Sequence, residues 1–233
     1  MRKIYLSLLF VFSIVIVKAQ SSEFSVQANS GFSHYTGSGT VGSTFLNNAP
    51  QSHSGYPNGD GNLNATIYGF DAQWQYIFKC NFILGLQAGY EAIGSKVNIN
   101  GVDAEGGEIS ATGSVTNRAD YINVNPYIGF RFNINKVRFD IMPGLDLAFG
   151  VGSQQSGTIK ASNGTYYNEN DNFSSAKDDV RLRLGLAAYY KKFGITAGYS
   201  HGLVNFNADE FADKPVPALR INVIRIGISY IIF

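Results

Sequence analysis

Nine charged residues of this chain occupy sequence positions whose side chains would point into the protein interior if their segments are β-strands. They are therefore the first candidates for functional residues. Six of them, three acids and three arginines, fall at similar heights in their segments: Asp71, Glu91, Asp146, Arg181, Arg183 and Arg225. A second group is expected closer to the short turns: Arg131, Arg138 and Asp140. Carboxylates and guanidinium groups held close together form strong, charge-assisted hydrogen bonds. We therefore expect two interior charge clusters.

Two interpretations of the larger cluster are open. In the first, the paired charges plug and stabilise a narrow barrel, because eight strands enclose just enough room for side chains. In the second, the same charges line a gated ion path or a narrow solute pore. The plug is favoured, since breaking a buried ion pair costs far more than forming it gains. The expected consequence is little or no steady conductance.

Catalytic chemistry would have to come from three histidines, His34, His53 and His201. Barrels that modify lipid A use a histidine with a serine or an acid near the outer rim, so Ser200 and His201 are the pair to weigh. Strand alternation puts His201 on the face of Tyr199 and away from Ser200, whereas a base and its nucleophile must lie within hydrogen-bond reach. We expect no catalytic residue and no enzyme activity.

Metal and cofactor binding are not expected either. The histidines show no metal-ligand spacing with Cys80, the single cysteine. The stretch 58–62 alternates oxygen-bearing side chains with glycines, as calcium loops do, but it lacks their acid count and their terminal glutamate. A turn is the simpler interpretation, and we assign no metal and no cofactor.

The elements that would position the charges follow from a repeated alternation of apolar and polar residues. The clearest segment sets a polar row containing Asp71 against an apolar row, namely Tyr68, Phe70, Ala72, Trp74, Tyr76 and Phe78. A two-residue period is the signature of a strand whose faces meet different surroundings. Eight segments show it: 24–35, 68–78, 82–90, 122–132, 137–149, 180–190, 193–199 and 224–232.

The connections between these segments are alternately short and long. Tight turns are predicted at 79–81, 133–136 and 191–192, and long polar stretches at about 36–63, 95–117, 152–178 and 205–218. Outer-membrane barrels have an even strand count, short periplasmic turns and longer extracellular loops. The sequence therefore predicts an all-β fold, an eight-stranded antiparallel up-and-down transmembrane β-barrel (a meander) with extracellular long loops.

The amino terminus predicts export. A basic start with Arg2 and Lys3 precedes an apolar run at 4–17, and small residues near Ala19 suit a cleavage site. The run is shorter than the roughly 20 residues that a spanning helix needs. We expect 1–19 to be a signal peptide cut between Ala19 and Gln20, and 20–233 to be the barrel domain. The mature chain is close to neutral, which gives no reason to expect nucleic acid as a partner.

A soluble eight-stranded barrel such as a lipocalin is the main rival, because alternation alone does not say which row points inward. Two features favour the membrane. The polar rows contain many glycines and paired charges, which suit a narrow lumen better than a surface in water. The sequence also ends on a strand at Phe233, without a helix to pack against a ligand-holding calyx.

With its export signal, eight strands, alternating connections and final strand ending in Phe233, the chain resembles the PorT-like outer-membrane β-barrel family and, more broadly, the OmpA-type membrane domain. The resemblance covers about residues 22–233 and implies an outer-membrane location. We expect a monomeric, non-enzymatic structural or interaction barrel that contacts outer-membrane lipid or lipopolysaccharide, with a protein or ligand partner at its long surface loops. The alternatives are a small-solute pore, a lipid-modifying enzyme and a secreted lipocalin-like carrier.

Overall fold

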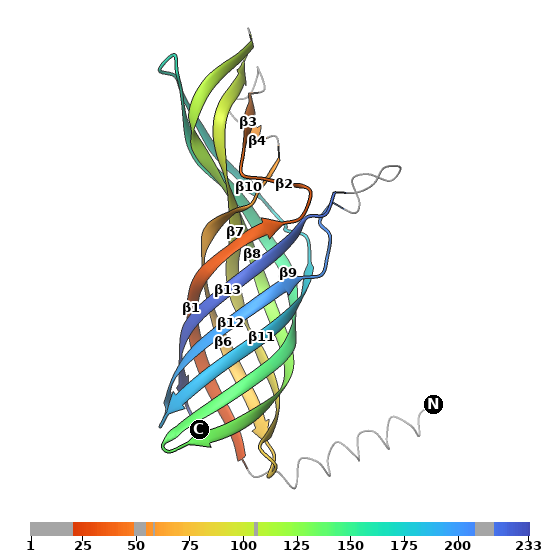
Figure 1. Ribbon diagram of the computed structural model, residues 1–233, viewed down its shortest axis with the longest axis vertical. Helices are drawn as coiled ribbons and strands as arrows, with labels where there is room; N and C mark the ends of the chain where they lie inside the picture. The colour runs from red at the N-terminus through yellow and green to blue at the C-terminus, as the bar shows by residue number, and fades with distance from the viewer. Residues whose placement is uncertain (1–20, 49–54, 58, 105–106, 208–216) are drawn as a thin grey trace, which may run out of the picture.

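The computed structural model describes residues 21–48, 55–57, 59–104, 107–207 and 217–233 (Figure 1). The predicted signal peptide and its cleavage site lie outside these residues, and both stay predictions. Within these stretches no helix is long and apolar enough to span a membrane. The strands, in chain order, are β1 (Ser21–Thr36), β2 (Thr40–Val41), β3 (Ser43–Asn48), β4 (Gly55–Pro57), β5 (Asp60–Gly61), β6 (Leu63–Ile77), β7 (Phe82–Ala104), β8 (Gly107–Ile134), β9 (Val137–Ala161), β10 (Tyr166–Phe173), β11 (Asp179–Tyr190), β12 (Phe193–Gly202) and β13 (Arg220–Ile231).

Eight of the described strands close into one barrel. Their order around the ring is β1, β6, β7, β8, β9, β11, β12 and β13, and every neighbouring pair is antiparallel. The ring closes where β13 returns to β1, with Tyr230 opposite Val26 and Ile224 opposite Phe32. A closed ring leaves no edge strand, so its backbone groups are paired even within lipid. This confirms the predicted eight-stranded up-and-down barrel.

The alternation along each strand decides which side chains face outward. Every barrel strand exposes bulky apolar residues on the outer surface; Phe70, Ile195 and Ile226, for example, are 62%, 67% and 64% exposed. The charged residues of the same strands, such as Asp146 and Arg225, are buried. An apolar outer band around a polar interior is the arrangement of a membrane barrel. The soluble calyx is excluded, because there the bulky residues would line the interior.

The two ends of the barrel differ. At one end, tight turns join β6 to β7, β8 to β9 and β11 to β12, and in them Asn81, Asn135 and Lys191 have positive φ angles of 65°, 54° and 55°. Left-handed backbone of this kind is tolerated mainly in turns, and asparagine is among the residues that adopt it most readily. The carboxyl terminus and the start of β1 lie at the same end (Figure 1). By the usual arrangement of such barrels, this end is periplasmic and the other extracellular.

The strands continue well beyond the barrel at the extracellular end. β7, β8 and β9 contain 23, 28 and 25 residues, whereas about 9–11 suffice to cross the hydrocarbon. Their outer parts join β10, β3 and β4 in a curled sheet of order β10-β9-β8-β7-β3-β4, which rises above the barrel (Figure 1). We call this sheet the extracellular extension.

The extension has an apolar core of its own. Its inward side chains form one buried cluster: Leu46, Val97, Ile99, Val102, Val115 and Ile159. The stretches 95–117 and 152–178, predicted as loops, are therefore largely strands. Their serines, threonines, asparagines and glycines resemble loop sequence, and an extra residue at Val151 in β9 shifts the alternation there. These two features hid the strands from the sequence pattern.

Candidate functional site

The lumen of the barrel holds a network of six charged side chains, three acids and three arginines. We call them the central charge network: Glu91, Asp146, Asp179, Arg181, Arg183 and Arg225. Glu91 lies at its centre. Arg225 donates to both carboxylate oxygens of Glu91, from Nε to Oε1 and from Nη2 to Oε2 at 2.7 Å. Arg181 Nη1 donates to Oε2 of Glu91 at 3.2 Å and its Nε to Asp179 at 2.6 Å, while Asn123 adds a 2.8 Å bond to Glu91.

Asp146 is the second acceptor of the network. Arg225 Nη2 and Arg183 Nη1 donate to its two carboxylate oxygens at 3.2 and 3.1 Å. The hydroxyl of Ser200 donates to Asp146 at 2.8 Å and accepts from Arg225 Nη1 at 2.5 Å. Each acid thus has an arginine partner and each arginine an acid, so that burial leaves no net charge in this layer. Ions that are buried in proteins are normally paired in this way.

Four strands supply the network, and their register explains why its members meet. β7, β9, β11 and β13 each turn these residues inward, and Arg181 lies opposite Asp146 in the β9–β11 pair. Asp71 of β6, expected in the same layer, lies apart from it. Its carboxylate accepts a 2.8 Å hydrogen bond from Asn29, and no ion pair links it to an arginine in the part of the chain that the structure describes. The structure therefore joins five of the six expected residues by direct contacts.

A second cluster lies near the periplasmic end. Arg131 is held between Asp140, at 2.7 Å from its Nε, and Glu23, at 2.8 Å from its Nη1. Arg138 Nη1 donates to Glu23 at 2.9 Å. The three residues expected there are thus joined, and Glu23 completes the set. We call these four residues the periplasmic charge cluster.

Uncharged polar side chains connect the two groups. Gln27 donates to Gln73, Gln73 to Gln75 at 2.9 Å, and Gln75 to Glu23 at 2.9 Å. The hydroxyl of Tyr127 donates to Gln75 at 3.0 Å. This ladder rises from the periplasmic charge cluster toward the central charge network and occupies the middle of the lumen with bonded groups.

Glycines let aromatic rings pack across the lumen floor. A Cβ atom on Gly85 would lie 2.1 Å from the Tyr127 ring, and one on Gly194 would lie 2.4 Å from the Tyr189 ring. The rings therefore rest directly on the backbone of the next strand. A cavity of about 20 Å³ lies between the two charge groups, with room for about one water molecule.

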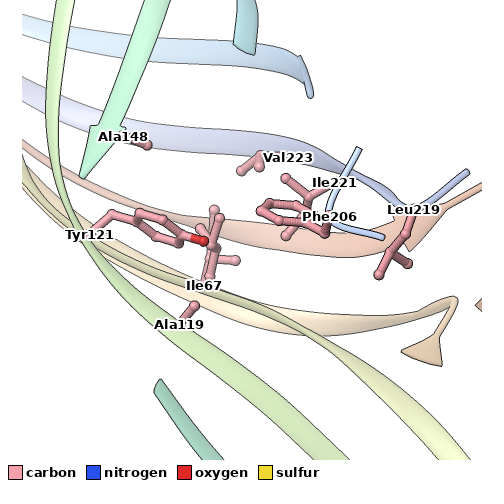
Figure 2. Packing of buried hydrophobic residues seen from close by; sticks show 9 residues of the cluster. Ile67, Ala119, Tyr121, Ala148, Phe206, Leu219, Ile221 and Val223 are labelled. Atoms are coloured by element: carbon pink, nitrogen blue, oxygen red, sulfur yellow. The ribbon is translucent and has the colours of Figure 1, made fainter. Parts of the chain in front are cut away.

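An apolar cluster lies on the extracellular side of the central charge network, and Figure 2 shows how its side chains pack together. We call it the apolar cap, and its buried members are Ile67, Ile93, Ala119, Tyr121, Ala148, Phe206, Leu219, Ile221 and Val223. The Arg181 guanidinium lies 5.0 Å from the centre of the Tyr121 ring, which joins the two layers. Phe206 comes from the connection after β12, and its N–H donates to the Leu219 carbonyl at 2.9 Å. Charged and apolar layers thus follow each other along the lumen.

The described residues that were considered for catalysis and metal binding do not come together in a site, and His53 lies outside the described residues. Ser200 points into the lumen, whereas His201 Nδ1 bonds to Asn222 at 2.7 Å on the other face of β12. Of the faint calcium pattern, Asn58 lies outside the described residues, and Asp60 belongs to β5, paired with β2. Among the residues described, no group of three or more His, Cys, Asp or Glu side chains could hold a metal ion.

Of the comparisons with known proteins, only the one with solved structures finds similar proteins. No protein-family model matches this chain, and no curated protein matches it in sequence. Neisserial surface protein A is 11% identical, with 91% of this chain and 99% of that chain covered and a TM-score of 0.38. A major outer membrane protein from Thermus thermophilus is 12% identical, with 91% and 100% covered and a TM-score of 0.35. Ail, the attachment invasion locus protein of Yersinia pestis, is 12% identical, with 91% and 99% covered and a TM-score of 0.32.

Scores this low define no shared architecture, so the fold assignment rests on the strand pairing described above. The resemblance to the PorT-like family stays a prediction.

Sequence reasoning missed three parts of the lumen. Glu23 and Asp179 stand at strand starts, where few neighbours establish the alternation, although both share the phase of inward residues further along. Phe206 belongs to a stretch with loop composition. The apolar cap was the third part, and for it the sequence holds a usable signal. Ile67, Ile93 and Ile221 continue the inward-facing polar rows toward the extracellular end in the same phase, which indicates that they also point into the lumen.

Proposed function

We propose that the protein is a non-enzymatic outer-membrane barrel with a closed lumen, which anchors the extracellular extension and presents it to molecules outside the cell. The observation that carries this proposal is the filling of the lumen. The central charge network, the polar ladder and the apolar cap occupy the lumen, and the cavity found between the charge groups measures about 20 Å³. The extension, by contrast, is a folded unit with its own core. The extension is thus the folded part of the molecule that lies outside the membrane and is available to other molecules.

A small-solute pore is the second candidate, and the contacts of the lumen disfavour it. A passing ion would have to separate Glu91 from Arg225, whose side chains are both buried and doubly hydrogen-bonded. Removing one partner of a buried pair typically costs about 3–5 kcal/mol. The ion would also have to pass the apolar cap, whose buried members carry no polar side-chain group other than the Tyr121 hydroxyl.

Lipopolysaccharide is the proposed neighbour of the outer surface, and the outward row of β8 supports it. Ile128 and Ile122 are exposed in the apolar band. Asp120 and Arg118 follow, and above them the row continues with small hydroxyl side chains at 112, 114 and 116. This order of apolar, charged and hydroxyl groups matches acyl chains, phosphates and sugars in turn, and arginine is well suited to bind phosphate.

Aromatic residues mark the same boundary. Tyr90 donates a 2.8 Å hydrogen bond to Asp120, and the Arg118 guanidinium lies 4.3 Å from the centre of the Tyr68 ring. Tyrosines at this level correspond to the aromatic girdle of membrane barrels.

Two measurements test the proposal. Cell fractionation is expected to place the folded protein with the outer membrane, resistant to extraction by salt and carbonate. Planar-bilayer recordings of the purified full chain are expected to show no stable openings. Large, steady channels from the unmodified protein would overturn the closed lumen, and release by carbonate would overturn the membrane-spanning barrel.

A further inference from the structure

A hollow of about 740 Å³ lies on the outer face of the barrel, toward its periplasmic end. It spans β9, β11, β12, β13 and β1, and outward-facing apolar and aromatic side chains form most of its lining: Ala28, Ala188, Tyr190, Phe193, Ile228 and Tyr230. Its volume lies in the range of sites that hold small organic ligands, about 300–1,000 Å³. Because its walls belong to the apolar band, it opens toward the lipid.

The pairing of the strands shows how the hollow forms. One row of outward residues runs across four neighbouring strands, in this order: Ala188, Ile195, Ile228 and Ala28. The row begins and ends with a side chain of a single carbon beside bulky neighbours, which leaves space above the sheet. Ala188 stands three residues from Lys191 of the β11–β12 turn, which is about 10 Å along the strand. The hollow is therefore at the depth of acyl chains, just inside the periplasmic surface of the membrane.

Lysines border the hollow on the side of the β11–β12 turn. The ammonium nitrogen of Lys191 lies 5.7 Å from the centre of the Tyr190 ring, and that of Lys192 lies 6.0 Å from the centre of the Tyr230 ring. Both rings line the hollow. Lys192 donates a 2.8 Å hydrogen bond to the Ile232 carbonyl, and an ammonium group has three donors. Two positive charges therefore stand at the edge of the hollow, where the apolar band meets water.

A third lysine adds to this charge, and the acids nearby do not cancel it. Val137 lies opposite Tyr190, so Lys136, which is exposed in the β8–β9 turn, stands beside the β11–β12 turn. In the described part of the periplasmic end, the acidic side chains are Glu23 and Asp140. Both are already bonded to arginines of the periplasmic charge cluster. The three lysines thus form a basic edge below the hollow.

We infer that the hollow binds one phospholipid of the periplasmic leaflet whose head group carries a net negative charge. An acyl chain fills the space beside Ala28 and Ala188, and the phosphate meets the ammonium groups of Lys191 and Lys192, because basic side chains at a membrane surface attract anionic lipids. A zwitterionic head group would bring an ammonium group of its own toward the lysines. A second copy of this chain, packed on the same face by two-fold symmetry, would set lysine against lysine. The inference needs the membrane-spanning barrel but neither the closed lumen nor the role of the extension.

The test reconstitutes the full chain in nanodiscs that contain equal amounts of phosphatidylglycerol, which is anionic, and phosphatidylethanolamine, which is zwitterionic. Native mass spectrometry of the released protein then counts the lipids that stay bound. The parent should retain one phosphatidylglycerol in preference to phosphatidylethanolamine. Lys191→Asn combined with Lys192→Gln should lower this preference about tenfold; asparagine tolerates the φ of 55° at position 191. Lys79→Gln is the matched control, because Lys79 is exposed in the β6–β7 turn and neither strand lines the hollow.

A second pair of variants tests the hollow itself. Ala28→Leu combined with Ala188→Leu fills it with apolar side chains that face lipid, and the retained lipid should be lost. Ala88→Leu, at an exposed alanine on the outer face of β7, should leave it in place. Heat-dependent gel mobility shows that each variant is folded.

Three results would overturn the inference. The first is a parent protein that carries no lipid or retains both lipids equally. The second is retention that survives the filling of the hollow by leucine. The third is a loss of preference in Lys79→Gln as large as in the double lysine variant, which would assign the effect to the overall charge of the periplasmic end. None of these results bears on the conductance of the barrel, so the site and the closed lumen are refuted separately.

Discussion

Replacing Arg225 by methionine should destabilise the barrel by about 3–5 kcal/mol, the usual effect of removing one partner from a buried ion pair. Arg225 is 3% exposed and donates to Glu91, Asp146 and Ser200. Without it, Glu91 keeps only Arg181, which also binds Asp179, and Asp146 keeps only Arg183 as its arginine partner, so the layer carries one uncompensated negative charge.

The matched second variant replaces Glu91 and Arg225 together by methionine. The network then keeps two pairs, Arg181 with Asp179 and Arg183 with Asp146, and its charge is again balanced. Since apolar replacement of a whole buried pair is often neutral or stabilising, the double variant should recover most of the lost stability. Arg220→Met, on an exposed residue of the same strand, should change it by less than about 0.5 kcal/mol.

Urea unfolding in lipid vesicles measures these differences through Trp74, the single tryptophan, which lies on the outer surface and is 43% exposed. Transfer of its ring from lipid to water shifts its fluorescence. If Arg225→Met cost less than about 1 kcal/mol, or if the double variant were no more stable than Arg225→Met, the lumen charges would not act as a balanced network.

Three further results are expected. Gly194→Val should cost about 1–3 kcal/mol in the same unfolding assay, because its Cβ would meet the Tyr189 ring; unchanged stability would contradict that packing. Leu46→Ala, in the core of the extension, should cost about 2–5 kcal/mol and make the extension sensitive to limited proteolysis while the barrel stays protected. Arg118→Ala should reduce the lipopolysaccharide that co-purifies with the protein, measured by mass spectrometry, and equal amounts would argue against a phosphate contact there.

The sequence was sufficient to predict the barrel because each strand has lipid on one side and the polar lumen on the other. These two surroundings impose a two-residue alternation of apolar and polar side chains. In 68–78 the apolar row had to face lipid and the polar row the lumen, so strand and orientation followed together. Partners within the lumen depend on the stagger between strands, which a single sequence does not reveal. Arg183 donates to Asp146 because the register of β9 and β11 brings their strands together at this level, while Asp71 has the correct phase but bonds to Asn29 instead.

The extension escaped prediction for a physical reason that also supports its location. In the apolar band the outer row of β8 holds Ile122 and Ile128, whereas above Asp120 the buried side is apolar, as at Val115, and the outer side is polar. The apolar side of the strand thus changes from outside to inside at the level of the Arg118–Tyr68 contact. An apolar outer face is stable in lipid, and an apolar core under a polar surface is stable in water. The inversion therefore marks where β8 leaves the membrane, and it makes the extension a water-exposed domain held up by strands that span the bilayer.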